Sequence, residues 1–155
     1  MEQENINALD EIHKGAYMGM DAINFILDKV QSKELAKVLH KQHNQYKDIA
    51  KRIEKIYSKY DNGEPHKTNT ITKAMTWYEI GMKTFADKSD SHIAELLLNG
   101  VNMGIIEGRK ILNKKDINKE VNKIVSIYVT MQEECVEILK KSGRRNFRSP
   151  DHYVQ

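Results

Sequence analysis

Residues 6–30 read INALDEIHKGAYMGMDAINFILDKV, and this stretch decides the fold of the chain. Its apolar residues recur at alternating steps of three and four, which is typical of a long helix that buries one side against other helices. We call this set the first stripe, and its members are Ile6, Leu9, His13, Ala16, Met20, Ile23, Leu27 and Val30. His13 is polar and Ala16 is small, so the middle of the first stripe is where a functional site has to be sought.

The same spacing recurs further along the chain and predicts more helices. A second helix is expected over residues 33–60, capped by Ser32, and a last helix over residues 117–142. Between them, residues 68–86 predict a shorter helix, and residues 91–112 predict another long one, with Asp90 or Ser91 as its cap. The sequence DNGEP at residues 61–65 is a strong turn signal that ends the second helix.

Four long helices and a shorter one predict an all-α bundle. The stretch between the second and third long helices is long enough to cross the whole bundle, because a helix of about 17 residues spans roughly 25 Å. We therefore expect a ferritin-like four-helix bundle with a short crossover helix between helices two and three. A simple up-and-down array of five helices is the alternative topology.

Composition fits a single cytoplasmic domain. The 155 residues are 39% hydrophobic and 30% charged, with only 2 Pro and 8 Gly, which favours a helix-rich globular chain. No apolar run approaches the roughly 20 residues of a membrane span, and the acidic start does not resemble a signal peptide. A single cysteine excludes an internal disulfide.

The basic character of the chain is concentrated at its end. Residues 140–155 hold five basic residues and one acidic residue, a net charge of +4, whereas the whole chain carries +3. We expect residues 1–142 to form the bundle and residues 143–155 to be a basic, flexible tail without regular structure. Arg144 and Arg145 are candidate partner-binding residues, and contact of the tail with nucleic acid or a membrane is the less favoured interpretation. Trp77, on the expected crossover helix, is a further candidate for partner binding.

Three short motifs carry a resemblance to a known family. They are LDEIHKGAYMGMDAI at residues 9–23, AKRI at residues 50–53 and NGVNMGI at residues 99–105. In these motifs the chain resembles small ferritin-like four-helix-bundle proteins of spore-forming bacteria, over roughly residues 8–141. The resemblance implies a bundle whose midpoint holds two metal ions, bound by one Glu from each of two helices and a Glu-x-x-His pair from each of the other two.

Most of those ligand positions are replaced in this chain. Ala16 and Val101 stand where the resemblance implies Glu, and Gln132-Glu-Glu-Cys135 keeps neither ligand of a Glu-x-x-His pair. His40-Lys-Gln-His43 keeps the spacing but has His in place of Glu, so only His43 matches. A di-iron site needs several carboxylates to neutralise and bridge its cations. We therefore predict a packed core and no metal.

Two other features have both a structural and a functional interpretation. If a metal site exists, His13, His43, Glu107 and Cys135 are its candidate ligands, which would suit Fe or Zn. These four residues come from four different helices, so a buried histidine bonded to a tyrosine or a carbonyl is the simpler reading. The series Gly100, Gly104 and Gly108 indicates close helix packing in preference to a surface that a ligand approaches.

These observations predict a non-enzymatic, ferritin-like bundle that has lost its di-iron site and acts by self-association or partner binding. The alternative is a metal-binding or oxidoreductase protein with an altered His/Cys/Glu ligand set. No catalytic residues and no cofactor-binding residues are predicted. We also expect a homodimer, because the crossover helix with Trp77 and Met82 offers apolar surface on the outside of the bundle.

Overall fold

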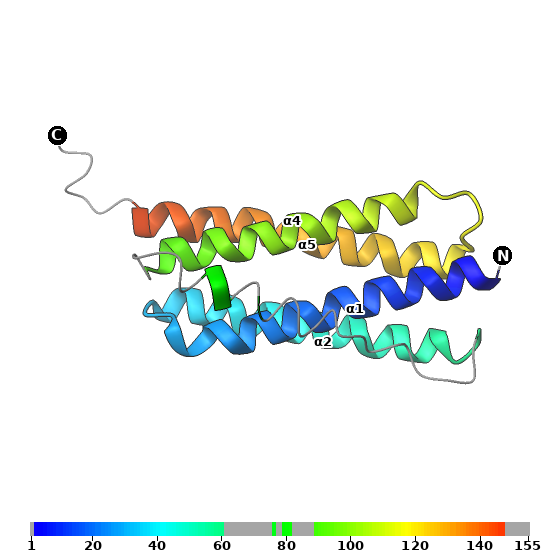
Figure 1. The fold of residues 1–155 in the computed structure, drawn as a ribbon, viewed down its shortest axis with the longest axis horizontal. Helices are drawn as coiled ribbons and strands as arrows, with labels where there is room; N and C mark the ends of the chain where they lie inside the picture. Colours follow the sequence, from blue (N-terminus) through cyan, green and yellow to red (C-terminus); the bar gives the residue numbers. More distant parts are fainter. Residues whose placement is uncertain (1, 61–75, 77–78, 82–88, 148–155) are drawn as a thin grey trace.

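The computed structural model describes residues 2–60, 76, 79–81 and 89–147, and its four long helices pack as a bundle (Figure 1). The helices are α1 (Glu2–Ile26), α2 (Lys33–Tyr57), α4 (Asp90–Leu112) and α5 (Lys119–Phe147), with a 3-10 turn, η1 (Leu27–Lys29), after α1. Residues 76 and 79–81 are also helical and lie between α2 and α4. The all-α bundle with a short helix between its second and third long helices is therefore confirmed.

Polar side chains set the starts of three helices. The Ser32 hydroxyl accepts a hydrogen bond from the Leu35 amide at the start of α2, as predicted. The start of α4 differs from the prediction, because Ser89 is its cap and accepts from the His92 amide. At the start of α5, the Asn118 side chain accepts from the Val121 amide at 2.9 Å. Each cap satisfies an amide that has no partner inside its helix.

The helices α2 and α4 begin at the same end of the bundle. The carboxylate of Asp90, in the first turn of α4, accepts hydrogen bonds from the amides of Gln31 and Ser32 at 2.9 and 2.7 Å. At the opposite end, the Asn118 side-chain amide donates to the hydroxyl of Tyr60, which follows α2. Tyr60, after the end of α2, and Ser89, at the start of α4, thus lie at opposite ends of the bundle, so α4 runs parallel to α2 (Figure 1).

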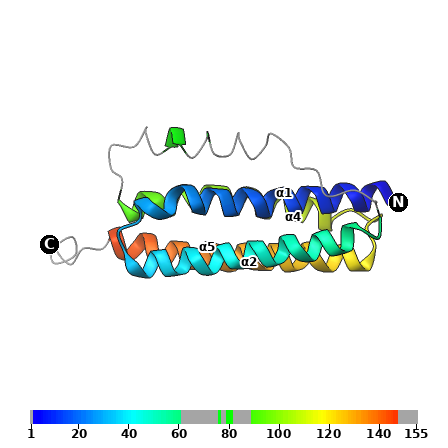
Figure 2. The ribbon, with the colours of Figure 1, turned by 90° about the horizontal axis from the view of Figure 1, so that it is seen from below.

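Figure 2 shows that α1 and α4 form one layer of the bundle and that α2 and α5 form the other. The first stripe is buried over its central part, from Leu9 to Ile23, whereas its outer members Ile6, Leu27 and Val30 are half-buried. On α5 the buried residue near the end is Leu139. The core therefore lies where the buried sides of the four long helices meet, along the whole length of the bundle.

Several predicted boundaries were wrong. The last helix does not end at Ser142, because α5 continues to Phe147 and includes Arg144 and Arg145. The segment predicted to lack regular structure from residue 143 is therefore helical at its start. The helix α2 ends at Tyr57, three residues before the predicted end. A helix can continue into solvent through charged residues, which leave no apolar pattern. The apolar pattern on its own therefore underestimates the length of α5.

Several sequence predictions concern residues outside the described part of the chain. They are the turn at residues 61–65, the placements of Trp77 and Met82 on the crossover helix, and the flexible tail at residues 148–155, and they stay predictions. No helix among the described residues has an apolar stretch long enough to cross a membrane.

Candidate functional site

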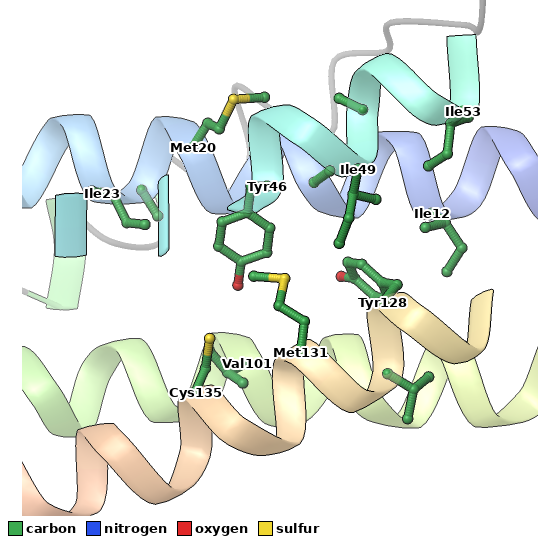
Figure 3. Packing of buried hydrophobic residues seen from close by; sticks show 14 of the residues in the cluster. Ile12, Met20, Ile23, Tyr46, Ile49, Ile53, Val101, Tyr128, Met131 and Cys135 are labelled. Atoms are coloured by element: carbon green, nitrogen blue, oxygen red, sulfur yellow. The ribbon is translucent and has the colours of Figure 1, made fainter. Parts of the chain in front are cut away.

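The centre of the bundle is packed with neutral side chains. Ala16, Val101, Gln132 and Cys135, which occupy positions where the resemblance implies metal ligands, are all buried. Figure 3 shows Tyr46 on α2 and Met131 on α5 pointing toward one another in this region. None of these side chains carries a charge at neutral pH, so the centre of the bundle does not supply the negative charge that two metal ions require.

A hydrogen-bonded chain of three side chains crosses this centre. The Tyr46 hydroxyl donates to Oε1 of Gln132 at 2.5 Å, and Nε2 of Gln132 donates to the Tyr128 hydroxyl at 3.1 Å. All three residues are buried, with exposed fractions of 2–3%. A buried amide that is paired on both its oxygen and its nitrogen has little desolvation cost, so Gln132 is stable in the buried centre of the bundle.

His13 is buried but its partner is not the one predicted. Its Nε2 lies 2.9 Å from Oε2 of Glu54 on α2, and its ring packs against Tyr17 with ring centroids 4.7 Å apart. The prediction of a tyrosine or carbonyl partner is therefore wrong. Glu54 is half-exposed, so its carboxylate reaches the buried imidazole from the surface of α2.

The other candidate metal ligands lie apart. His43 is half-buried and lies near the carboxyl of Asp21. Burial raises the pKa of Asp21 above its ordinary value, and His43 partly opposes that shift. Glu107 is exposed and pairs with Lys110 at 3.4 Å. Cys135 is buried, and desolvation raises the pKa of its thiol to about 12, so it stays protonated. Among the described residues, no three His, Cys, Asp or Glu side chains are grouped in a way that would hold a metal ion.

A pocket of about 400 Å³ lies between α1 and α4. We call it the α1–α4 pocket. Its floor is formed by the polar side chains Gln42, Tyr46, Tyr128 and Gln132, which come from α2 and α5. Its walls are apolar and are formed by Ile12, Met18, Ile23, Leu97, Val101 and Met103. A pocket of this size, mostly apolar with a few polar groups, is typical of small-molecule sites in proteins.

Glycines bring the walls of the pocket close to its floor. A Cβ atom at Gly15 would lie 2.5 Å from the Tyr128 hydroxyl, and one at Gly19 would lie 2.5 Å from the ring of Tyr46. A Cβ atom at Gly104 would meet the Gln132 amide nitrogen and the Tyr128 hydroxyl. Because these positions lack side chains, α1 and α4 approach the polar floor directly.

The amide nitrogen of Gln42, at the floor, has no hydrogen-bond partner among the described residues. Gln42 is only 3% exposed, and no hydrogen-bond acceptor among the described residues pairs with its Nε2. The neighbouring floor residues Tyr46, Gln132 and Tyr128 bond to one another, as described above. A buried amide nitrogen without an acceptor is uncommon, because it costs about 1–3 kcal/mol of stability.

Sequence reasoning missed the floor of this pocket. The sequence signal for this floor was a polar residue on the buried side of a helix, because Gln42 and Gln132 are both buried. The glycine series does pack closely, because Gly104 and Gly108 approach Gln132 and Val129 on α5. Gly100 and Gly104 also line the pocket. Close packing is therefore confirmed at Gly104 and Gly108, whereas ligand approach is not tested.

Arg144 and Arg145 lie near the end of α5. Trp77 lies outside the described residues, so its candidate role stays a prediction. We compared the chain with protein-family models, with curated proteins and with solved structures, and none of them matches.

Proposed function

We propose that this chain is a non-enzymatic, ferritin-like bundle that has lost its di-iron site and acts by binding, with the α1–α4 pocket as its binding site for a small organic molecule. The parallel direction of α2 and α4 supports the ferritin-like part of the proposal, because a single long crossover is the mark of that topology. The single observation that carries the binding function is a pocket of about 400 Å³ with a polar floor inside an apolar wall.

The chemistry of the central residues favours binding over redox catalysis. Two divalent ions about 4 Å apart repel one another strongly unless carboxylates lie between them. At the centre of this bundle stand Ala16, Val101 and the bonded pair Tyr46 and Gln132, which are all neutral. Ala16, Val101 and Gln132 present methyl groups and an amide where the resemblance implies carboxylates.

The α1–α4 pocket has the features of a ligand site and not of a packing defect. Packing defects in cores are small and lined by apolar groups, whereas this pocket is large and has polar groups at its floor. Its walls depend on glycines, which lower the stability of a helix interior by about 1 kcal/mol each relative to alanine. Gly15, Gly19, Gly100 and Gly104 all line the pocket, so the cost is concentrated there.

Binding of a neutral fluorescent probe, N-phenyl-1-naphthylamine, tests this function. We expect saturable binding to the native protein with one probe per chain. The double variant Met18→Trp/Met103→Trp places bulk on both walls and should weaken binding at least about tenfold, a loss of about 1.4 kcal/mol. Ile106→Trp is the matched control, since Ile106 is also exposed on α4 but does not line the pocket. Equal binding by all three proteins would contradict the proposal.

Metal analysis separates this function from the metalloprotein alternative. Protein purified without a metal-binding tag should carry no stoichiometric iron, manganese or zinc, and His43→Ala should leave its metal content unchanged. His43 is the one matching ligand position, so a real site would depend on it. A near-stoichiometric metal that disappears in His43→Ala would establish the alternative.

A further inference from the structure

The amide nitrogen of Gln42, which has no acceptor among the described residues, says more about the ligand than the shape of the pocket does. We infer that the α1–α4 pocket takes a neutral, largely apolar molecule with a carbonyl-type oxygen, and that Nε2 of Gln42 donates a hydrogen bond to that oxygen. This inference rests on the proposed binding function and adds to it the chemical class of the ligand and the residue that orients it.

The floor of the pocket selects for an acceptor. Tyr46 donates its hydroxyl proton to Gln132, and Gln132 donates to Tyr128, so these donors are already engaged inside the protein. Nε2 of Gln42 is the buried floor donor that has no acceptor among the described residues. A ligand oxygen placed there removes the cost of that unpaired donor, whereas a ligand ammonium group or hydrocarbon, which has no acceptor, does not.

The mouth of the pocket selects against an anion. The charged residues that line it, among those described, are Glu11, Lys14 and Glu107, which sum to one negative charge. Lys14, the cation of this set, is paired with Glu11 at 3.5 Å. A carboxylate or phosphate would therefore meet net repulsion from these residues, and the described lining holds no unpaired cation for it.

A ligand cation is disfavoured for a different reason. The floor offers an N–H donor, and a buried ammonium group needs acceptors in its place. The glutamates that could attract a cation lie at the mouth and are partly exposed, and Glu107 already pairs with Lys110. The apolar walls fit the hydrocarbon part of a molecule, so the remaining class is a neutral compound with an oxygen acceptor.

Two probes of nearly the same shape test this inference. They are 2-acetylnaphthalene, which has a C=O group, and 2-isopropenylnaphthalene, which has a C=CH2 group at the same place. Binding of each to the full chain is measured by NMR titration. We expect the ketone to bind about three- to tenfold more tightly, the range for one net hydrogen bond. The side-chain NH2 signals of Gln42 should shift with the ketone and much less with the alkene.

Variants at Gln42 show whether this residue sets the preference. Gln42→Leu and Gln42→Met replace the amide with an apolar side chain of similar size and so remove the donor. The ketone and the alkene should therefore bind equally. Gln45→Leu is the matched control, because Gln45 lies on the same helix but does not line the pocket, and it should keep the preference. If both Gln42 variants fail to fold, the NH2 shifts of the native protein decide the question.

The outcomes separate the two proposals. If both probes bind the native protein equally, or if the preference survives in Gln42→Met, the pocket is a binding site and the role of Gln42 is refuted. If neither probe binds, and N-phenyl-1-naphthylamine does not bind either, the pocket is filled by protein side chains and both proposals are refuted. A ketone preference that is lost only in the Gln42 variants supports both.

Discussion

Replacing Gly15 with alanine should destabilise this protein, although the same change stabilises most helices. Gly15 lies in the middle of α1, where alanine is normally favoured over glycine by about 1 kcal/mol. Here the added Cβ would lie 2.5 Å from the hydroxyl of Tyr128 and 3.2 Å from Cζ of its ring. Overpacking of this kind costs about 1–3 kcal/mol. The net expectation is a loss of about 1 kcal/mol.

Tyr128 cannot easily move away from the new methyl group. Its side chain is 2% exposed, and its hydroxyl accepts a hydrogen bond from Gln132. Moving the ring would break that bond and disturb the packing of the floor. The strain therefore has to be shared between α1 and α5, and it should appear as a lower free energy of unfolding.

A double-mutant cycle with Tyr128→Phe isolates this contact. Removal of the hydroxyl leaves Cζ, at 3.2 Å, as the nearest atom, and a shift of a few tenths of an ångström relieves that contact. In the Tyr128→Phe background, Gly15→Ala should therefore be neutral or stabilising. The coupling energy between the two sites should be about 1–2 kcal/mol, within the range for residues in contact.

Urea denaturation followed by circular dichroism measures all four proteins of the cycle. A loss of 1 kcal/mol lowers the melting temperature of a chain of this size by about 2–4 °C, so thermal scans provide a second readout. If Gly15→Ala raises stability by the same amount in both backgrounds, the close approach of α1 to Tyr128 is refuted.

Four further results are expected. Asp90→Ala should cost about 1.5–3 kcal/mol in urea denaturation, because two backbone amides lose a charged acceptor; no change would contradict the role of this carboxylate. Burial raises the pKa of Asp21, so the folded state binds that proton more tightly than the unfolded state and the carboxylate lowers stability above the folded pKa. Asp21→Asn should therefore raise the melting temperature at pH 7 and not at acid pH below the ordinary pKa, and a gain of equal size at both would contradict this. Cys135, with a thiol pKa of about 12, should resist iodoacetamide at pH 8 until urea unfolds the chain, and rapid native labelling would contradict its burial. Light scattering should show a homodimer that Ile106→Lys weakens, since Ile106 is 54% exposed on α4, and a clean monomer of the native chain would remove this prediction.

The helices of this protein follow from local sequence. The three-and-four spacing of the first stripe fixes which side of α1 is buried, because only that side gathers apolar residues. Ser32 marks the start of α2 for an equally local reason, since a serine hydroxyl satisfies an amide three residues later. The end of α5 is less well determined, because charged residues such as Arg144 and Arg145 are compatible with both helix and coil.

The pocket was decided only by the tertiary structure. The sequence shows glycines on two helices and glutamines on two others, but it does not show that they meet. Their meeting depends on the lateral order of the helices, which places α1 beside α4 and the floor residues of α2 and α5 beneath them. Likewise, the partner of His13 is Glu54, 41 residues away, and spacing within one helix carries no information about such a contact. Periodicity reports which side of a helix is buried, whereas contacts between helices report what is buried against it.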